Sequence, residues 1–213
     1  DKLEILAFNA LPAALSPDMW SHQYDQQTNQ VQCALLPKDH VIFGTNGPDS
    51  HLFGLEPNFG CCTANFNQGW PKFALATFLR SEKGIVSAAL APASVHTVID
   101  GHAVTCTLET EYPFRNTLRY RIVTDGPVSF ELKLRIPGCA KSATVNGTVA
   151  QPGTFFVMDQ VWSGTTEIVV ALEFACETVA RPRKMQVLWR GPLLYSVAID
   201  ERWEKLEYTR DGV

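Results

Sequence analysis

The residues best suited to chemistry are two adjacent cysteines in the segment Gly60-Cys61-Cys62-Thr63. The sequence predicts that this segment lies where a loop meets the start of a helix, where free backbone N–H groups and the helix dipole favour a thiolate. A thiolate is both the nucleophilic and the metal-binding form of cysteine. Tetrahedral zinc needs about four ligands, so the pair would supply only part of a site. From spacing alone, two small buried hydrophobic thiols are the alternative.

Three residues upstream are candidates for binding or proton transfer. In the stretch His22-Gln23-Tyr24, an extended backbone places His22 and Tyr24 on one side, where they would offer hydrogen bonds to sugar hydroxyls. Glu56 precedes the cysteines and is a candidate general acid if a pocket raises its pKa. The alternatives are a solvated strand edge for His22 and Tyr24 and an ordinary loop carboxylate for Glu56. Spacing picks out no carboxylate pair of the ordinary glycosidase kind.

These candidates lie in a long irregular segment, roughly residues 16 to 60, between two predicted helices. Connections of this length usually carry function or belong to a larger architecture. The second helix follows the cysteines and is predicted to run to about Arg80, with a kink or a fresh start at Pro71. The first helix has no N-terminal cap, which indicates a chain cut from a longer protein. Its apolar stripe comprises Leu3, Leu6, Ala7, Ala10, Leu11, Ala14 and Leu15.

From Gly84 to about Val179 the pattern is typical of half-buried strands, with apolar and polar residues alternating. The turn signals in this region predict an antiparallel sandwich of about seven or eight strands. They are Asp100-Gly101, Asp125-Gly126-Pro127, Pro137-Gly138, Asn146-Gly147, Pro152-Gly153 and Ser163-Gly164. After Pro182, more continuous apolar runs indicate that the chain leaves the sandwich and packs against another layer.

The composition is that of a globular chain, with 213 residues of which 46% are hydrophobic and 19% are charged. The formal net charge is -4 and no cluster of basic residues interrupts it, which argues against a nucleic-acid partner. No apolar run approaches the roughly 20 residues of a membrane-spanning helix, so the sequence predicts a soluble protein. The six cysteines do not form a dense disulfide framework, and we expect them to be reduced.

Several strings resemble the β-L-arabinofuranosidases of glycoside hydrolase family 127 and their uncharacterised relatives. The resemblance extends in order over nearly the whole chain. The matching strings are residues 8–13, FNALPA; 55–72, LEPNFGCCTANFNQGWPK; 111–114, EYPF; 132–138, LKLRIPG; and 190–195, RGPLLY.

The resemblance implies a mixed, mainly β fold in which the end of an (α/α)6 barrel precedes an antiparallel β-sandwich. Residues 1–83 would be the C-terminal part of the catalytic barrel, including helices and an active-site loop. Residues 84–180 would form the sandwich domain. Residues 181–213 would be a return segment that packs on the sandwich or on the barrel.

The resemblance also implies a mechanism. Cys61 would be the nucleophile of a retaining hydrolase that removes β-L-arabinofuranosyl groups from plant-type glycans, and Cys62 would be a zinc ligand, with Cys61 also touching the zinc. His22 and Tyr24 match a region that lines the sugar pocket in relatives. The remaining zinc ligands, in a Glu-x-Cys motif, and the general acid/base glutamate would lie upstream of Asp1. We therefore expect this chain alone to be inactive.

Two other hypotheses stay open. The chain is then either a non-catalytic carbohydrate-binding or structural sandwich module, or the holder of a structural zinc completed by Cys33 and His40. A thiol pair, in place of exposed aromatic residues, favours the enzyme over the binding module. The sequence leaves the linkage preference, the oligomeric state and the compartment open, with both the cytoplasm and secretion compatible.

Overall fold

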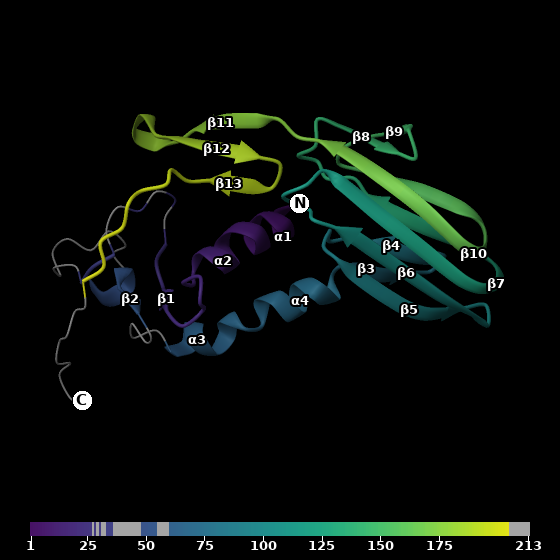
Figure 1. The fold of residues 1–213 in the computed structure, drawn as a ribbon, viewed down its shortest axis with the longest axis horizontal. Helices are drawn as coiled ribbons and strands as arrows, with labels where there is room; N and C mark the ends of the chain where they lie inside the picture. Colours follow the sequence, from purple (N-terminus) through teal and green to yellow (C-terminus); the bar gives the residue numbers. More distant parts are fainter. Residues whose placement is uncertain (27, 29, 31–32, 36–47, 55–59, 205–213) are drawn as a thin grey trace.

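The computed structural model describes residues 1–26, 28, 30, 33–35, 48–54 and 60–204, and it joins a helical part to a larger β part (Figure 1). The N-terminal helix is continuous through α1 (Lys2–Ile5), the π-helical turn η1 (Leu6–Ala10) and α2 (Leu11–Ala13). Asp1 makes no side-chain capping hydrogen bond, as expected. The predicted apolar stripe is only partly covered, because Ala7 is buried whereas Leu3 and Leu6 are exposed.

The second helical stretch is divided into α3 (Gly60–Phe66) and α4 (Gly69–Leu75), which confirms the break near Pro71. The prediction that this helix runs to Arg80 is wrong. The strand β3 (Phe78–Ser81) begins three residues after α4 ends. The backbone leaves the helix because Ala76 and Thr77 accept hydrogen bonds from the N–H groups of Ala89 and Ala88, which extend the β3–β4 ladder.

An eight-stranded sheet forms the β part. Its strands pair in the order β3-β4-β7-β10-β8-β9, and β6 pairs with both β5 and β7. The prediction of a purely antiparallel arrangement is wrong at one ladder, since β4 runs parallel to β7. The remaining strands are β4 (Gly84–Ser87), β5 (Ala93–Ile99), β6 (His102–Thr110), β7 (Thr117–Arg135), β8 (Ser142–Val145), β9 (Thr148–Ala150) and β10 (Phe155–Glu173).

Two predicted turns are instead points inside long strands. Asp125-Gly126-Pro127 lies within β7 and Ser163-Gly164 lies within β10, and their pairing register shifts between Trp162 and Gly164. Such an irregularity bends a strand without ending it. The first half of β7 therefore pairs with β6, and its second half pairs with β4.

Other turn predictions are confirmed. The loops Asp100-Gly101 and Asn146-Gly147 connect β5 to β6 and β8 to β9. All four residues have positive φ angles of 47° to 82°. This conformation is the one that two-residue hairpin loops require, and Asn, Asp and Gly adopt it most readily.

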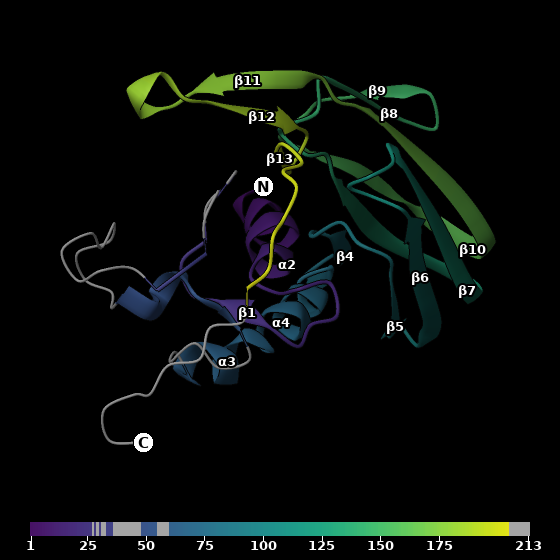
Figure 2. The same ribbon diagram turned by 60° about the vertical axis from the view of Figure 1, so that its left-hand side comes forward.

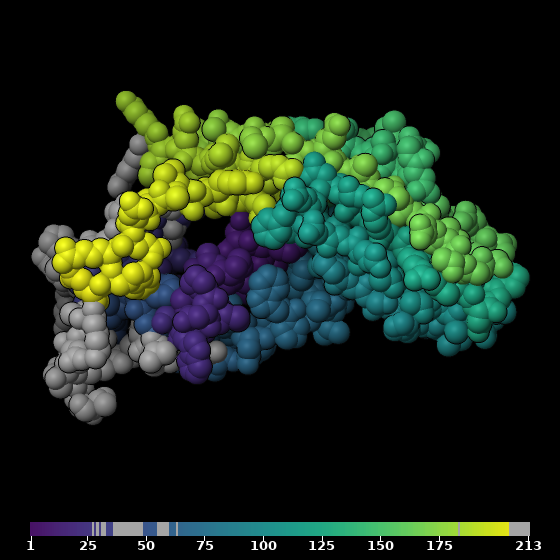
Figure 3. All heavy atoms as spheres, viewed as in Figure 1, coloured from purple at the N-terminus to yellow at the C-terminus, as the bar shows by residue number. Residues whose placement is uncertain are grey.

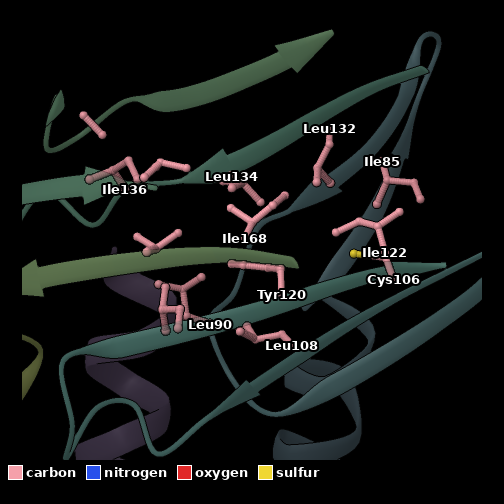
Figure 4. Packing of buried hydrophobic residues seen from close by; sticks show 14 of the residues in the cluster. Ile85, Leu90, Cys106, Leu108, Tyr120, Ile122, Leu132, Leu134, Ile136 and Ile168 are labelled. Atoms are coloured by element: carbon pink, nitrogen blue, oxygen red, sulfur yellow. The ribbon is translucent and has the colours of Figure 1, made fainter. Parts of the chain in front are cut away.

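One hydrophobic core fills the space that the bent sheet encloses. Figure 4 shows side chains of this core from several strands, among them Tyr120 of β7 and Ile168 of β10. The Tyr120 and Ser87 hydroxyls lie 2.8 Å apart and link β7 to β4, and the Trp162 Nε1–H donates to the carbonyl of Phe130. Cys106 belongs to this core, where burial raises the pKa of its thiol to about 12.

A separate three-stranded sheet follows the β part and lies across the N-terminal helix (Figures 2 and 3). It consists of β11 (Cys176–Ala180), β12 (Gln186–Arg190) and β13 (Leu193–Tyr195), with the short helix η4 (Pro182–Lys184) between the first two strands. Asn9, in the π-helical turn, holds the sheet. Its Nδ2 donates to the carbonyl of Pro192 at 2.8 Å, and its Oδ1 accepts from the N–H of Leu194 at 2.8 Å.

A buried carboxylate joins the N-terminal helix to the β part. Glu4 is 2% exposed, and its Oε1 accepts from the N–H of Leu90 at 2.7 Å and pairs with the guanidinium of Arg135. Its Oε2 accepts from the Tyr112 hydroxyl at 2.7 Å. Arg135 also pairs with Asp1, so the first turn of the helix is fixed to the end of β7. A buried charge of this kind is stable only when its lone pairs are satisfied, as they are here.

Two expectations about the architecture remain. Among the described residues, the helices do not form a ring, so the barrel stays a prediction. None of the helices in the described part of the chain is both long and apolar enough to cross a membrane.

Candidate functional site at the cysteine pair

The sulfur atoms of Cys61 and Cys62 converge at the start of α3. Neighbouring residues on a helix point about 100° apart, so their side chains do not normally face each other. Here the two Sγ atoms lie 3.7 Å apart. This distance is too long for a disulfide, and neither cysteine forms one. Two sulfurs that share a tetrahedral zinc, each about 2.3 Å from it, lie about 3.8 Å apart. The pair therefore has the spacing of two ligands on one metal.

The exposure of the two cysteines bears on the alternative that they are buried hydrophobic thiols. Cys61 is exposed and Cys62 is of intermediate exposure, so two buried hydrophobic thiols are not what the structure shows. The helix dipole, by contrast, carries less weight than the sequence suggested, because α3 has only seven residues. The convergence of the two sulfurs is the feature that supports chemistry at this site.

A chain of polar side chains along α3 and α4 fixes the backbone that carries Cys61. Asn65 donates through Nδ2 to the Cys61 carbonyl at 2.6 Å and accepts through Oδ1 from Gln68 Nε2 at 2.9 Å. Lys72 Nζ then donates to Gln68 Oε1 at 2.8 Å. The sequence analysis missed these residues. Their spacing of three or four was the available signal, because it places them on one helical face.

The N-terminal helix supports this pair of helices from one side. The rings of Phe8 and Phe73 meet edge to face with centroids 5.4 Å apart, and Phe73 is buried. A Cβ added to Gly69, the first residue of α4, would lie 2.7 Å from Leu11 Cδ2. Glycine thus lets α4 approach α2 closely. Since α1 is tied to the β part through Glu4, this approach fixes α4, the helix that follows α3, relative to the sheet.

His22 and Tyr24 flank a buried glutamine in the short strand β1 (His22–Gln23), which pairs with β2 (Phe53–Gly54). Gln23 is 6% exposed, and its Nε2 donates to the His51 carbonyl at 2.9 Å. Because side chains alternate along an extended chain, His22 and Tyr24 point away from the buried side. Tyr24 is 37% exposed, and the sugar-binding role of His22 and Tyr24 stays a prediction.

The structural zinc hypothesis gains no support in the described residues. Cys33 accepts a hydrogen bond from Gln23 Nε2 at 3.3 Å, and burial raises the pKa of its thiol. The hydrogen bond favours the thiolate that zinc requires, but burial has the larger effect and opposes it. No group of three or more His, Cys, Asp or Glu with a metal-binding arrangement occurs in the part of the chain that the structure describes. His40 and Glu56 lie outside it.

A buried histidine lies beside a carboxylate, and both residues are among the polar side chains upstream of the cysteines. His51 closes the short helix η3 (Pro48–His51), and its side chain is 3% exposed. Its Nε2 lies 4.0 Å from Asp25 Oδ2. The backbone N–H of Asp25 donates to the Ser50 carbonyl at 2.9 Å, which fixes the chain after Tyr24 to η3. Sequence spacing offered no signal, because the two residues come from distant segments.

Comparison with known proteins identifies the β part. Residues 85–174 match the family described as "Beta-L-arabinofuranosidase, GH127 middle domain". This stretch is a GH127 middle domain. No curated protein matches the chain.

Solved structures share the fold. A glycoside hydrolase matches with a TM-score of 0.67 and 19% sequence identity, over 90% of this chain and 33% of that one. A GH127 β-L-arabinofuranosidase from Geobacillus stearothermophilus T6 and another GH127 β-arabinofuranosidase each match with a TM-score of 0.63 and 17% identity, over 90% of this chain and 32% of theirs. The chain thus spans about a third of the length of these structures.

The GH127 middle domain contains strands β4 to β10, whereas the cysteine pair lies before it in the sequence. The contacts of Glu4, Phe8 and Gly69 described above connect the two regions. The chain is therefore a relative of glycoside hydrolases that covers part of their length, with its cysteine pair on the helical side.

Proposed function

We propose that this chain is the C-terminal part of a retaining glycoside hydrolase that removes β-L-arabinofuranosyl groups from plant-type glycans, with Cys61 as the nucleophile. The observation that carries the proposal is the 3.7 Å separation of the two sulfurs next to a GH127 middle domain. Two of the matched structures are of β-arabinofuranosidases, enzymes that act on the same sugar class.

The cysteine pair fits zinc, because the sulfur separation agrees with two shared tetrahedral positions. We assign Cys62 as a ligand and Cys61 as a thiolate that also touches the metal. Bound zinc lowers the pKa of a coordinating thiol and so keeps it deprotonated. The pair supplies two of about four ligands. The proposal places the others, together with the general acid/base, outside residues 1–213.

Cys61 acts through a double displacement. Its sulfur attacks the anomeric carbon, the C1–S bond forms, and the bond from C1 to the leaving oxygen breaks as that oxygen takes a proton from the general acid. A water then attacks C1, the C1–S bond breaks with its electron pair returning to sulfur, and the water proton goes to the same acid/base group. Two inversions at C1 give overall retention.

The other residues have supporting roles in this proposal. Asn65 holds the Cys61 carbonyl, which keeps the nucleophile in place during both steps. His22 of β1 and Tyr24, which follows the strand, bind sugar hydroxyls, a role for which an imidazole and a phenol both offer donors and acceptors. We keep the division of the chain into residues 1–83, 84–180 and 181–213 as part of the same proposal, with the first as barrel, the second as sandwich and the third as return segment.

Substitution in the protein that carries this chain tests the proposal. The assay measures sugar release from an aryl β-L-arabinofuranoside. Cys61→Ser is expected to abolish turnover, whereas Cys176→Ser, at an exposed free cysteine of β11, is the matched control and is expected to leave turnover unchanged. Full activity in Cys61→Ser would remove Cys61 as the nucleophile. In that case the binding or structural module becomes the better account.

A further inference from the structure

We propose that the open side of the β part carries a second binding site, a pocket for a neutral sugar unit of a glycan. The pocket has a volume of about 610 Å³ and lies between the β3–β4 hairpin and β5, with β7 and β10 contributing. Helix α4 lies between α3, which carries the cysteine pair, and these strands, so the pocket is separate from the cysteine pair (Figure 1). The sugar class rests on the proposed function.

The hollow exists because the bent sheet does not close over β5. The core-facing residues of β5 include Val95, Thr97 and Ile99, and all three are only half-buried. By contrast, Val104 and Cys106, which face the core from the neighbouring strand β6, are 1% and 0% exposed. The opposite layer ends at β3, the edge strand, and leaves the inner face of β5 uncovered.

The floor of the pocket is apolar. Phe78, Val95 and Ile99 are partly buried and pack against the core, and each also lines the pocket. Small-molecule sites generally combine such a floor with a few polar groups, in volumes of about 300–1,000 Å³. The apolar C–H face of a sugar ring suits contact with this floor, and the volume accommodates one or two sugar units.

The rim offers charges of both signs that have no partner within the described part of the chain. Arg80 and Lys83 come from the β3–β4 hairpin, and Asp100 and Asp159 come from the β5–β6 turn and from β10. Buried among them, Ser81 Oγ also lacks a hydrogen-bond partner in that part of the structure. A ligand that both donates and accepts at each polar group satisfies all five, and a sugar hydroxyl does this.

The mixed charge also argues for a neutral occupant. An anion would be repelled by the Glu82, Asp100 and Asp159 carboxylates, which all line the pocket, and a cation by Arg80 and Lys83. A neutral polyol avoids both penalties and takes charge-assisted hydrogen bonds from each side. A second site of this kind holds a branched or polymeric glycan close to the enzyme, which raises the effective concentration of cleavable groups at the first site.

Titration of the full 213-residue chain with arabino-oligosaccharides, followed by NMR amide shifts, tests this proposal. We expect saturable binding with a dissociation constant in the millimolar range and shifts that cluster at residues 78–85 and 95–100. Arg80→Ala and Asp159→Ala are each expected to weaken binding about fivefold or more. The matched controls are Arg119→Ala and Glu167→Ala, exposed residues of β7 and β10 that do not line the pocket.

Three results would overturn the proposal. They are the absence of shifts at the pocket, equal affinity in the pocket variants and the controls, and saturable binding of inorganic phosphate in preference to the sugar. Asp159→Asn keeps the shape of the rim and preserves the test if an alanine variant does not fold. Cys61→Ser separates this proposal from the first, because it should abolish hydrolysis in the parent protein and leave binding at the pocket unchanged. If the parent protein hydrolyses the substrate but no sugar binds at the pocket, the second binding site is rejected and the proposed hydrolase activity is not.

Discussion

Removing one hydroxyl from the Glu4 network should destabilise the protein measurably. In Tyr112→Phe, Glu4 Oε2 loses the 2.7 Å hydrogen bond from the Tyr112 hydroxyl, while Leu90 and Arg135 still satisfy Oε1. The ring contacts with Phe8 and Phe174 are retained, so only the hydroxyl is tested. A hydrogen bond to a charged group contributes about 1.5–3 kcal/mol to the free energy of unfolding. We expect a loss in this range, because the carboxylate stays buried.

Tyr120→Phe is the matched control. It removes the same atom from a buried tyrosine whose partner, the Ser87 hydroxyl at 2.8 Å, is neutral. A neutral hydrogen bond contributes about 0.5–1.5 kcal/mol. Urea unfolding of the 213-residue chain, followed by tryptophan fluorescence, gives both free energies. Equal losses in the two variants, or a loss in Tyr112→Phe below that in Tyr120→Phe, would refute the assignment of Glu4 as a buried charge that the tyrosine stabilises.

Three further measurements follow from the structure. Burial raises the pKa of Tyr112 and of Tyr120 above the usual value. Ultraviolet absorbance should therefore show that these two of the five tyrosines stay protonated at pH 11. Since unfolded tyrosines ionise near pH 10, the contribution of these two groups to the free energy of unfolding is complete below pH 10 and declines as the pH rises above it. Burial raises the pKa of Cys106 to about 12, so at pH 8 its thiol should react with a disulfide reagent only after unfolding, unlike the exposed Cys176, and equal reactivity would contradict this. Asn9→Ala removes the contacts with Pro192 and Leu194, so amide hydrogen exchange in β13 should accelerate while exchange in β7 is unchanged; equal acceleration in both strands would mean that Asn9 acts on the whole fold.

The strand content and two of the hairpin turns could be predicted from the sequence because their signals are local. Asn146-Gly147 and Asp100-Gly101 specify a backbone conformation by themselves, and the structure has it. Ser163-Gly164 carries a similar signal but lies inside β10. A dipeptide that contains glycine permits a turn or a bulge equally well. The pairing of β10 with β7, which are distant in sequence, decides between them.

The end of the second helix shows the same limit. Residues 76–80 continue an apolar helical pattern, but hydrogen bonds to the chain after β4 pull Ala76 and Thr77 out of the helix. Gly84 was a usable signal for the close approach of β4 to β7. A Cβ at this position would lie only 2.1 Å from the Glu131 carbonyl oxygen, so a residue without a side chain is needed where β4 pairs with β7.

In the candidate site, too, the sequence pointed to residue types but not to contacts between distant segments. Cys61 and Cys62 stood out from their residue type and adjacency alone, whereas the shared side of His22 and Tyr24 was inferred from alternation and stays a prediction. The 3.7 Å approach of the sulfurs required the helix geometry, since adjacent helical residues usually diverge. The His51–Asp25 contact and the Glu4 network join segments far apart in the sequence, so neither spacing nor composition could reveal them.

Trapping the covalent intermediate tests the central claim most directly. The protein that carries this chain is mixed with an aryl β-L-arabinofuranoside, quenched with acid during turnover, digested and analysed by mass spectrometry. We predict that the peptide containing Cys61 gains the mass of one pentosyl residue, with fragmentation placing it on Cys61 and not on Cys62. A pentosyl residue found on a carboxylate, or turnover that inverts the anomeric configuration with no adduct on Cys61, would contradict the account.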